Sequence, residues 1–330
     1  MKRKNLFQEY GVLIAFGALF GISIVTRGAS FLQFENLRNI LSQSAYVGII
    51  AVGMTLVIIS AGIDLSVGSL VAFCGALCVL TLNKMGPSGD TVAILAALGA
   101  SVAVGLASGL VNGLIVAYGR VAPFVVTLAG LAGFRSLALV LGKGGEIRSE
   151  VPAIGDVGFG GIPIPGANLA NGDPVKLYWS AIAFLLVALI AGFVLNRTRF
   201  GRYVIAVGAN EKAARYSAIN TESVKVAVYT IIGALSGLAA FFNVARMNSV
   251  GTGSVGNFYE LDAIAAVVIG GTSLAGGKGR IWGTVVGVIL MTLISNMMTA
   301  YRVDTNWQGL VSGLVILIAV LLQRGSKVNG

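Results

Sequence analysis

The sequence predicts an all-α, polytopic integral membrane protein with about 10 transmembrane helices. Of its 330 residues, 56% are hydrophobic and 11% are charged, whereas a soluble domain carries about 25% charged residues. The mean hydropathy is +0.88. Apolar stretches close to the roughly 20 residues that span a bilayer recur along the whole chain, with short polar segments between them.

Ten apolar segments are expected to cross the membrane: 10–26, 41–61, 66–82, 92–118, 121–142, 177–195, 224–245, 261–276, 281–299 and 307–322. The second and third are separated only by a short turn, and the fourth is long enough to be tilted or broken. The longest polar gap, 143–176, is shorter than the roughly 50 residues of a small domain. We therefore expect one transmembrane domain, 1–330, without a fused ATPase, sugar-binding domain or soluble enzyme.

Basic residues set the expected orientation of these segments. If the N-terminus lies inside and ten segments cross, the inside loops and termini hold 14 of the 23 lysines and arginines, and the outside loops hold eight. The sequence therefore predicts an N-in, C-in topology. This distribution also explains the net charge of +10, which in a soluble protein would suggest nucleic acid. The largest inside loop is 196–223.

Several kinds of chemistry have no support in the sequence. There is no histidine, which removes the commonest metal ligand and the usual general base. The only two cysteines, Cys74 and Cys78, lie in one apolar segment and predict helix packing rather than a disulfide or a metal site. Glycine-rich stretches at 251–256 and 276–278 resemble phosphate loops, but each lacks the required context or residues. We expect no metal, no cofactor and no nucleotide site in this chain.

Polar side chains in or beside the predicted spans are candidates for a translocation pathway. Arg135 lies well inside a span and either donates hydrogen bonds to a polar substrate or pairs with carbonyls or an acid within the protein. Asp64 either caps the following helix or lines the pathway. Three intramembrane amides either bind sugar hydroxyls or hold helices together: Asn112, Asn243 and Asn296.

The inside loop 196–223 contains a short predicted helix. Asn210 is a good N-cap residue, and Glu211 suits the positive end of a first helical turn. Ala213, Ala214 and Ser217 then fall on one helix face by their spacing. Such a face of small residues could dock in a groove of a partner. The alternative is a surface loop that only carries inside charges.

Four long motifs add a family resemblance. They are Ala-Val-Gly-Met-Thr-Leu-Val-Ile-Ile-Ser-Ala-Gly-Ile-Asp-Leu-Ser-Val-Gly-Ser at 51–69, Pro-Phe-Val-Val-Thr-Leu at 123–128, Thr-Arg-Phe-Gly-Arg-Tyr at 198–203, and 259–280, which begins Tyr-Glu-Leu-Asp-Ala-Ile. Over nearly its whole length the chain resembles the permease subunits of bacterial ABC sugar importers, the ribose permease family of branched-chain/monosaccharide-type permeases. That family usually has a glycine where this chain has Ala218.

The resemblance implies a set of partners. A second permease copy completes a homodimeric pathway within the lipid membrane, and an ABC ATPase subunit docks on its inner face. A periplasmic or lipid-anchored sugar-binding protein delivers the substrate outside, and nucleic acid is not a partner. The chain itself is not an enzyme and lies in the bacterial inner membrane. The expected substrate is a neutral monosaccharide, ribose or a related pentose; the alternative is a self-sufficient sugar facilitator or secondary carrier.

The resemblance also places candidate site residues. We expect coupling to the ATPase through the segment that contains Gly208, Asn210, Ala213, Ala214, Ser217 and Ile219. Three residues of the matching motifs join the pathway candidates above: Ser66, Phe124 and Thr127. Glu260 and Asp262 are expected to contribute to docking of the binding protein.

Overall fold

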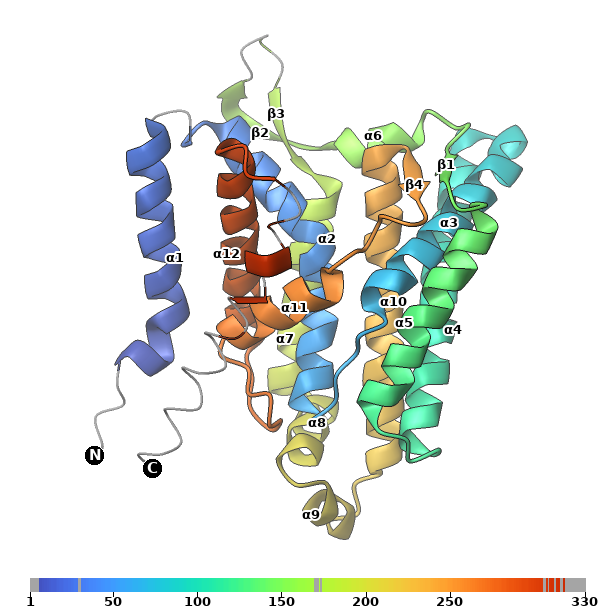
Figure 1. Ribbon diagram of the computed structural model, residues 1–330, viewed down its shortest axis with the longest axis vertical. Helices are drawn as coiled ribbons and strands as arrows, with labels where there is room; N and C mark the ends of the chain where they lie inside the picture. Colours follow the sequence, from blue (N-terminus) through green and yellow to red (C-terminus); the bar gives the residue numbers. More distant parts are fainter. Residues whose placement is uncertain are drawn as a thin grey trace.

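The computed structural model describes residues 6–28, 31–168, 172, 174–304, 307, 309–311, 313–314 and 317. In this part of the chain, helices stand side by side in one bundle (Figure 1). Seven of them are long and apolar enough to cross a membrane: α2 (Phe34–Ile59), α3 (Val67–Met85), α4 (Asp90–Ala117), α5 (Pro123–Leu141), α7 (Trp179–Arg197), α10 (Thr221–Met247) and α12 (Ile281–Ala300). The mostly helical, polytopic fold is confirmed.

The two ends of the bundle differ. The α9 end carries the short helices α8 (Arg199–Ala209) and α9 (Glu211–Tyr216), and the α6 end carries α6 (Ile154–Phe159) and four short strands (Figure 1). α1 (Leu6–Arg27) begins toward the α9 end and packs on α12, where the Ser23 hydroxyl lies 3.1 Å from the sulfur of Met297.

Most predicted spans coincide with a helix, but the span at 261–276 is wrong. Only α11 (Tyr259–Ile269) is helical there, and its 11 residues are about 16 Å long at 1.5 Å per residue, too short for a bilayer. Gly271, Gly276 and Gly277 follow with positive φ values, so the apolar composition continues into a turn. The predicted span at 307–322 lies largely outside the described residues. The long segment at 92–118 forms one unbroken helix, α4.

Two helices start part-way through the bundle. α2 runs to the α9 end, and the chain then turns back as an extended segment before α3 begins inside (Figure 1). α10 runs the opposite way, and the segment after it also returns inward before α11 begins. The starts of α3 and α11 meet, because a Cβ on Gly68 would overlap the carbonyl oxygen of Gly256, and one on Gly256 would overlap that of Gly68.

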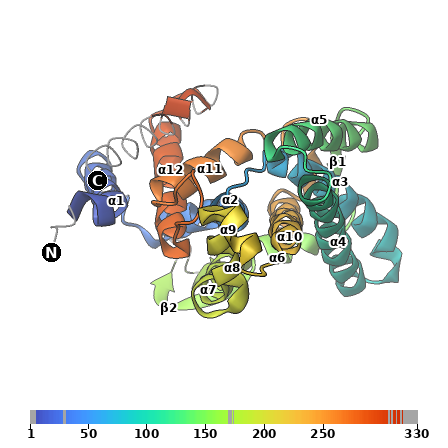
Figure 2. The same cartoon turned by 90° about the horizontal axis from the view of Figure 1, so that it is seen from below.

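Glycines bring α4 and α10 into direct backbone contact. A Cβ on Gly105 would overlap the carbonyl oxygen of Gly233, and one on Gly237 would overlap that of Ser101. The Ser101 hydroxyl donates to the Gly237 carbonyl over 2.7 Å. The glycine spacing in the sequence predicted such close approach. Figure 2 shows α10 between α4 and the central, almost fully buried α2.

Short strand pairs cap the α6 end and were not predicted. β1 (Glu146–Arg148) pairs antiparallel with β4 (Ser249–Gly251), and β2 (Gly161–Asn168) with β3 (Pro174–Tyr178). Aromatic side chains hold this cap on the bundle, because the guanidinium of Arg246 lies 4.2 Å from the ring centre of Phe159. The guanidinium of Arg38 lies 4.8 Å from that of Tyr178.

Candidate functional site

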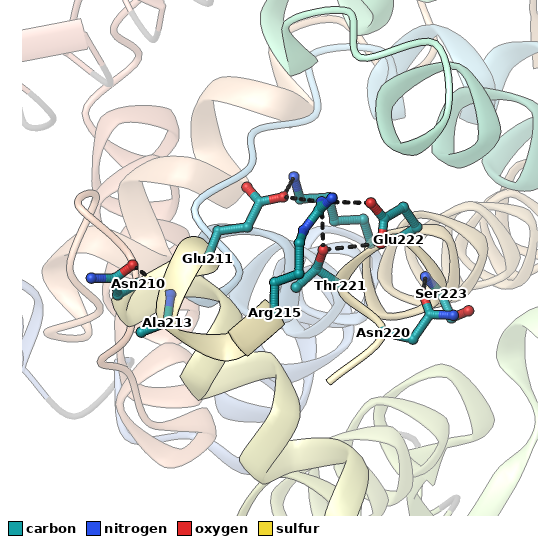
Figure 3. Close-up of polar contacts among 9 residues, drawn as sticks. Asn210, Glu211, Ala213, Arg215, Asn220, Thr221, Glu222 and Ser223 are labelled. Carbon is teal, nitrogen blue, oxygen red and sulfur yellow. Dashed lines mark hydrogen bonds and ion pairs between the residues drawn. The ribbon is translucent and has the colours of Figure 1, made fainter. Parts of the chain in front are cut away.

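The segment at the α9 end consists of helices that each begin with a side-chain cap. Thr198 accepts a hydrogen bond from Gly201 N at the start of α8. Asn210 Oδ1 accepts from Ala213 N at 3.0 Å and starts α9, as predicted. Asn220 Oδ1 accepts from Ser223 N at 2.9 Å and starts α10 (Figure 3). These caps separate α8, α9 and α10 with tight turns.

Charged side chains tie α9 to the first turn of α10. Arg215 lies 2.5 Å from a Glu222 carboxylate oxygen and 3.6 Å from one of Glu211 (Figure 3). Lys225 lies 2.7 Å from the same Glu211 oxygen. These groups are partly exposed, so each pair adds less than about 1 kcal/mol. As a network they fix how α9 is oriented on α10.

The predicted docking residues divide into an inner and an outer set. Ala214 is 4% exposed and belongs to the hydrophobic core. Gly208 is also buried, because a Cβ there would overlap the carbonyl oxygen of Ile59. Ala213 and Ser217 are exposed, as is Asn210, while Ile219 is half-buried. The prediction that Ala214 shares an outward face with Ala213 and Ser217 is therefore wrong.

The outward face of α9 contains an aromatic residue that the sequence analysis missed. Tyr216 is 91% exposed and lies three residues after Ala213, on the same side of the helix. The sequence analysis considered only small residues on this face, although the helical spacing also places Tyr216 there. Exposed tyrosines with an apolar ring and a polar tip are frequent binding hot spots.

Polar side chains gather at the start of α3. Asp64 Oδ1 accepts from Ser66 N at 2.8 Å and from Ser66 Oγ at 2.6 Å, so Asp64 shapes the turn before the helix. Ser66, and not Asp64, is the N-cap residue. Asn112 Nδ2 on α4 donates to Ser66 Oγ over 3.1 Å. The three side chains are each at most 4% exposed and join α3 to α4.

Arg135 on α5 holds the segment that precedes α11. Its Nη1 donates to the carbonyl oxygens of Thr252 and Val255, both at 2.9 Å. Its Nη2 donates to Asn257 Oδ1 at 2.9 Å. Charge-assisted bonds from a planar guanidinium are strong and directional. Arg135 therefore has carbonyl partners within the protein, one of the two alternatives for this residue.

The remaining pathway candidates lie at separate positions on α5, α10 and α12. Thr127 is buried and donates to the Pro123 carbonyl of its own helix over 2.9 Å. Phe124, one turn below, is 53% exposed. Asn243 Nδ2 lies 3.4 Å from the hydroxyl of Tyr259, and Asn296 is half-buried on α12. Asn243 thus joins α10 to α11, whereas the polar cluster at Asp64 joins α3 to α4.

Glu260 and Asp262 are both half-buried. Both are in the first turn of α11, which begins part-way through the bundle (Figure 1). A Cβ on Gly68 would overlap a Glu260 carboxylate oxygen, so this carboxylate sits against α3. The returning segment carries both residues inward from the α6 end, and their part in docking a binding protein stays a prediction.

A cleft of about 450 Å³ opens at the α6 end. Its walls are the turn between α5 and β1 and the segment from Met247 to Val255. The Ser249 hydroxyl donates to Glu146 there and lowers the pKa of that carboxyl below its usual value. Hydroxyls, a carboxylate and backbone groups suit a neutral, hydroxyl-rich ligand. In the sequence, this segment stands out only through the glycine-rich stretch 251–256, which resembles a phosphate loop but lacks its context.

The family model and the relatives that match this chain all describe permeases. Residues 36–320 match the family described as branched-chain amino acid transport system / permease component. The ribose import permease protein RbsC of Escherichia coli (strain K12) is 41% identical over 322 residues, which cover 97% of this chain and 95% of the relative. RbsC of Bacillus subtilis (strain 168) is 40% identical over 324 residues, covering 95% and 94%.

A third relative is named for xylose rather than ribose. The xylose transport system permease protein XylH of Escherichia coli (strain K12) is 33% identical over 377 residues, covering 99% of this chain and 94% of the relative. No solved structure matches this chain.

Proposed function

This chain belongs to the family of branched-chain amino acid transport system permease components, and from that premise we propose that it forms the translocation pathway of an ABC importer for ribose. The observation that carries the proposal is the 41% identity to a ribose import permease along 97% of the chain. A related pentose ranks second, since a xylose permease is 33% identical. The protein is a multi-pass membrane protein of the bacterial inner membrane.

A separate ATPase subunit supplies the energy in this proposal. The ATPase docks on the exposed side of α9, where Ala213, Tyr216 and Ser217 form the contact. Gly208 and Ala214 are buried and support α9 from inside the bundle. The fixed orientation of α9 on α10 supports this role, because a rigid contact transmits movement better than a mobile loop. The α9 end then faces the cytoplasm. α1 begins toward the same end (Figure 1), which supports an inside N-terminus.

The outer face and the pathway follow from this orientation. A sugar-binding protein docks at the α6 end, where the cleft opens, and a second permease copy completes the pathway. We place the sugar path beside the start of α3, where Asn112 and Ser66 offer hydrogen bonds to hydroxyls in a conformation that exposes these two buried side chains. Ten crossings with both termini inside remain part of the proposal: the returning segment Ser249–Phe258 and α11 together make one crossing, and the segment at 307–322 makes the last.

Growth and uptake on a panel of sugars test the substrate. A strain that lacks this chain should lose ribose uptake and regain it with the chain on a plasmid, while glucose uptake stays unchanged. The matched control is the same plasmid with Gly256→Ala, which is expected to lower ribose uptake about tenfold without removing the gene. Unchanged ribose uptake in the deletion strain, together with a large loss for another sugar, contradicts the assignment to ribose.

A further inference from the structure

The segments on either side of α11 lie against α8 at one end of the bundle and against the cleft at the opposite end. At the α9 end, the turn after α11 packs on α8, because a Cβ on Gly277 would lie 2.8 Å from the Cα of Ala209. The Gly277 amide also donates to the Ile59 carbonyl over 2.8 Å. α8 leads directly into α9. Backbone contacts therefore connect α8 and α2 to the turn that follows α11.

The N-terminal end of α11 is held just as directly. The segment before it, Ser249–Phe258, forms a wall of the cleft with its first half. The same segment bears three acceptors for Arg135, two of them backbone carbonyls. Thr252 also fixes it to the turn after α5, since its hydroxyl donates to the Gly145 carbonyl over 2.7 Å. The segment is thus held at two places, by Arg135 on α5 and by the turn that follows α5.

We propose that Arg135 is a positioning residue that makes α5 and the segment Ser249–Phe258 move as one body, so that a movement of α8 and α9 passes along α11 to the outer cleft. The proposal rests on the proposed function, because the driving movement comes from the ATPase at the α9 end. Arg135 does not touch the sugar in this scheme. It transmits a change of shape between two ends of the pathway.

The chemistry of the contact favours transmission over simple cohesion. A guanidinium that binds two carbonyls and one amide oxygen fixes both the distance and the direction between α5 and the segment. By contrast, α3 meets α11 through the backbones of Gly68 and Gly256 and the Glu260 carboxylate beside Gly68, a contact that we take as the place that gives way. Coupling through packed elements requires such a combination of stiff links and a place that gives way.

Thiol labelling of the cleft in the assembled complex tests this inference. The reporter is Ser254→Cys, an exposed position on the cleft wall, and the native Cys74 and Cys78 are fully buried. Chain, ATPase and sugar-binding protein are reconstituted in proteoliposomes, and the labelling rate is measured with and without ATP. The variants are Arg135→Gln, Arg135→Lys and Asn257→Ala, and the control is Ser136→Ala, an exposed neighbour.

In the reporter chain, ATP should change the labelling rate by about tenfold, the scale of one charge-assisted hydrogen bond. Arg135→Gln should abolish this response, Arg135→Lys should restore part of it, and Ser136→Ala should leave it intact. Asn257→Ala removes one acceptor from an exposed residue and should reduce the response about threefold. The ribose-to-xylose uptake ratio should stay unchanged in every variant.

An unchanged response to ATP in Arg135→Gln overturns the inference, and so does a reporter that never responds to ATP while uptake proceeds. If Arg135→Gln does not reach the membrane, Asn257→Ala decides alone: a full response overturns the inference. An altered sugar ratio assigns Arg135 to substrate contact instead. Failure of the proposed function is visible separately, as loss of ATP-dependent uptake in the parent chain before any variant is made.

Discussion

The pair α4–α10 and the pair α3–α11 use glycine in opposite ways. α4 and α10 are unbroken, and their glycines bring the two backbones together over several turns. α3 and α11 start part-way through the bundle, and their starts meet at Gly68 and Gly256, where Gly256 has a φ of 77°. Contact repeated over several turns resists displacement, whereas a single backbone contact leaves both partners able to turn. We interpret α4–α10 as the frame and α3–α11 as the moving part.

The first prediction concerns the frame. Gly105→Ala places a methyl group against the Gly233 carbonyl and should lower stability by about 1–3 kcal/mol through overpacking. The matched control on the same helix is Gly99→Ala, where no atom lies within 4 Å of the new Cβ; it should stabilise the helix by up to about 1 kcal/mol. Thermal unfolding in detergent measures both. Equal melting temperatures for the two variants contradict the role of Gly105.

A second experiment distinguishes moving part from frame. Gly256→Ala forces a methyl group onto a backbone with positive φ and against the Gly68 carbonyl. The strain of about 1–3 kcal/mol falls on a contact that has to change during transport. We expect uptake to fall about tenfold with little loss of protein from the membrane. Gly253→Ala, which meets only an ordinary contact at 3.6 Å, should keep most of its uptake. Equal uptake in both variants removes Gly256 from the mechanism.

The third prediction extends the comparison to α9, whose two alanines differ in burial. Ala213→Glu adds a charge on the exposed side, where surface changes cost within about 0.5 kcal/mol. Membrane abundance should stay normal while ATPase co-purification and uptake fall. Ala214→Glu buries an unpaired charge in the core, which costs about 3–5 kcal/mol, so the protein itself should be depleted. Wild-type uptake of Ala213→Glu with the ATPase bound would reduce α9 to a connector.

The smallest effect concerns the turn after α9. Ala218 has a φ of 59°, a left-handed conformation that costs a residue with a Cβ about 1–2 kcal/mol. Ala218→Gly relieves this strain but loses some of the gain to chain entropy. We expect a net stabilisation of about 0.5–1 kcal/mol, measured as a higher melting temperature with unchanged uptake. A lower melting temperature of Ala218→Gly would contradict this prediction and show that the turn does not favour glycine at this position.

Periodic features of the fold could be predicted from the sequence, and non-local ones could not. The spacing of Gly105 and Gly233 predicted close helix contacts, because it repeats along each helix, but not that these two helices pair. Hydropathy extended the predicted span past Ile269, since glycine and alanine count as apolar in a turn as well as in a helix. The predicted common face of Ala213 and Ala214 was wrong, because Ala214 points into the core and Ala213 outward. Which of them faces the protein depends on where α9 packs.

The contacts of Arg135 show the same limit. Its charge inside an apolar span marked it as a functional candidate, but its partners include the backbone carbonyls of Thr252 and Val255. Backbone acceptors leave no residue pattern, so only the fold reveals them. The hydrogen bonds of Asp64 with Ser66 were nearly predictable, because both residues are local in sequence. The meeting of Gly68 with Gly256 joins two segments far apart in the chain and had no signal.

Uptake by purified components tests the central claim, that this chain is the pathway of an ATP-driven sugar importer. The chain is reconstituted in proteoliposomes alone, with its ATPase, and with the ATPase and the sugar-binding protein together, and entry of labelled ribose is followed with and without ATP. The account predicts accumulation only when all components and ATP are present. Flux or accumulation of ribose by the chain alone, independent of ATP, would contradict it and identify a self-sufficient carrier.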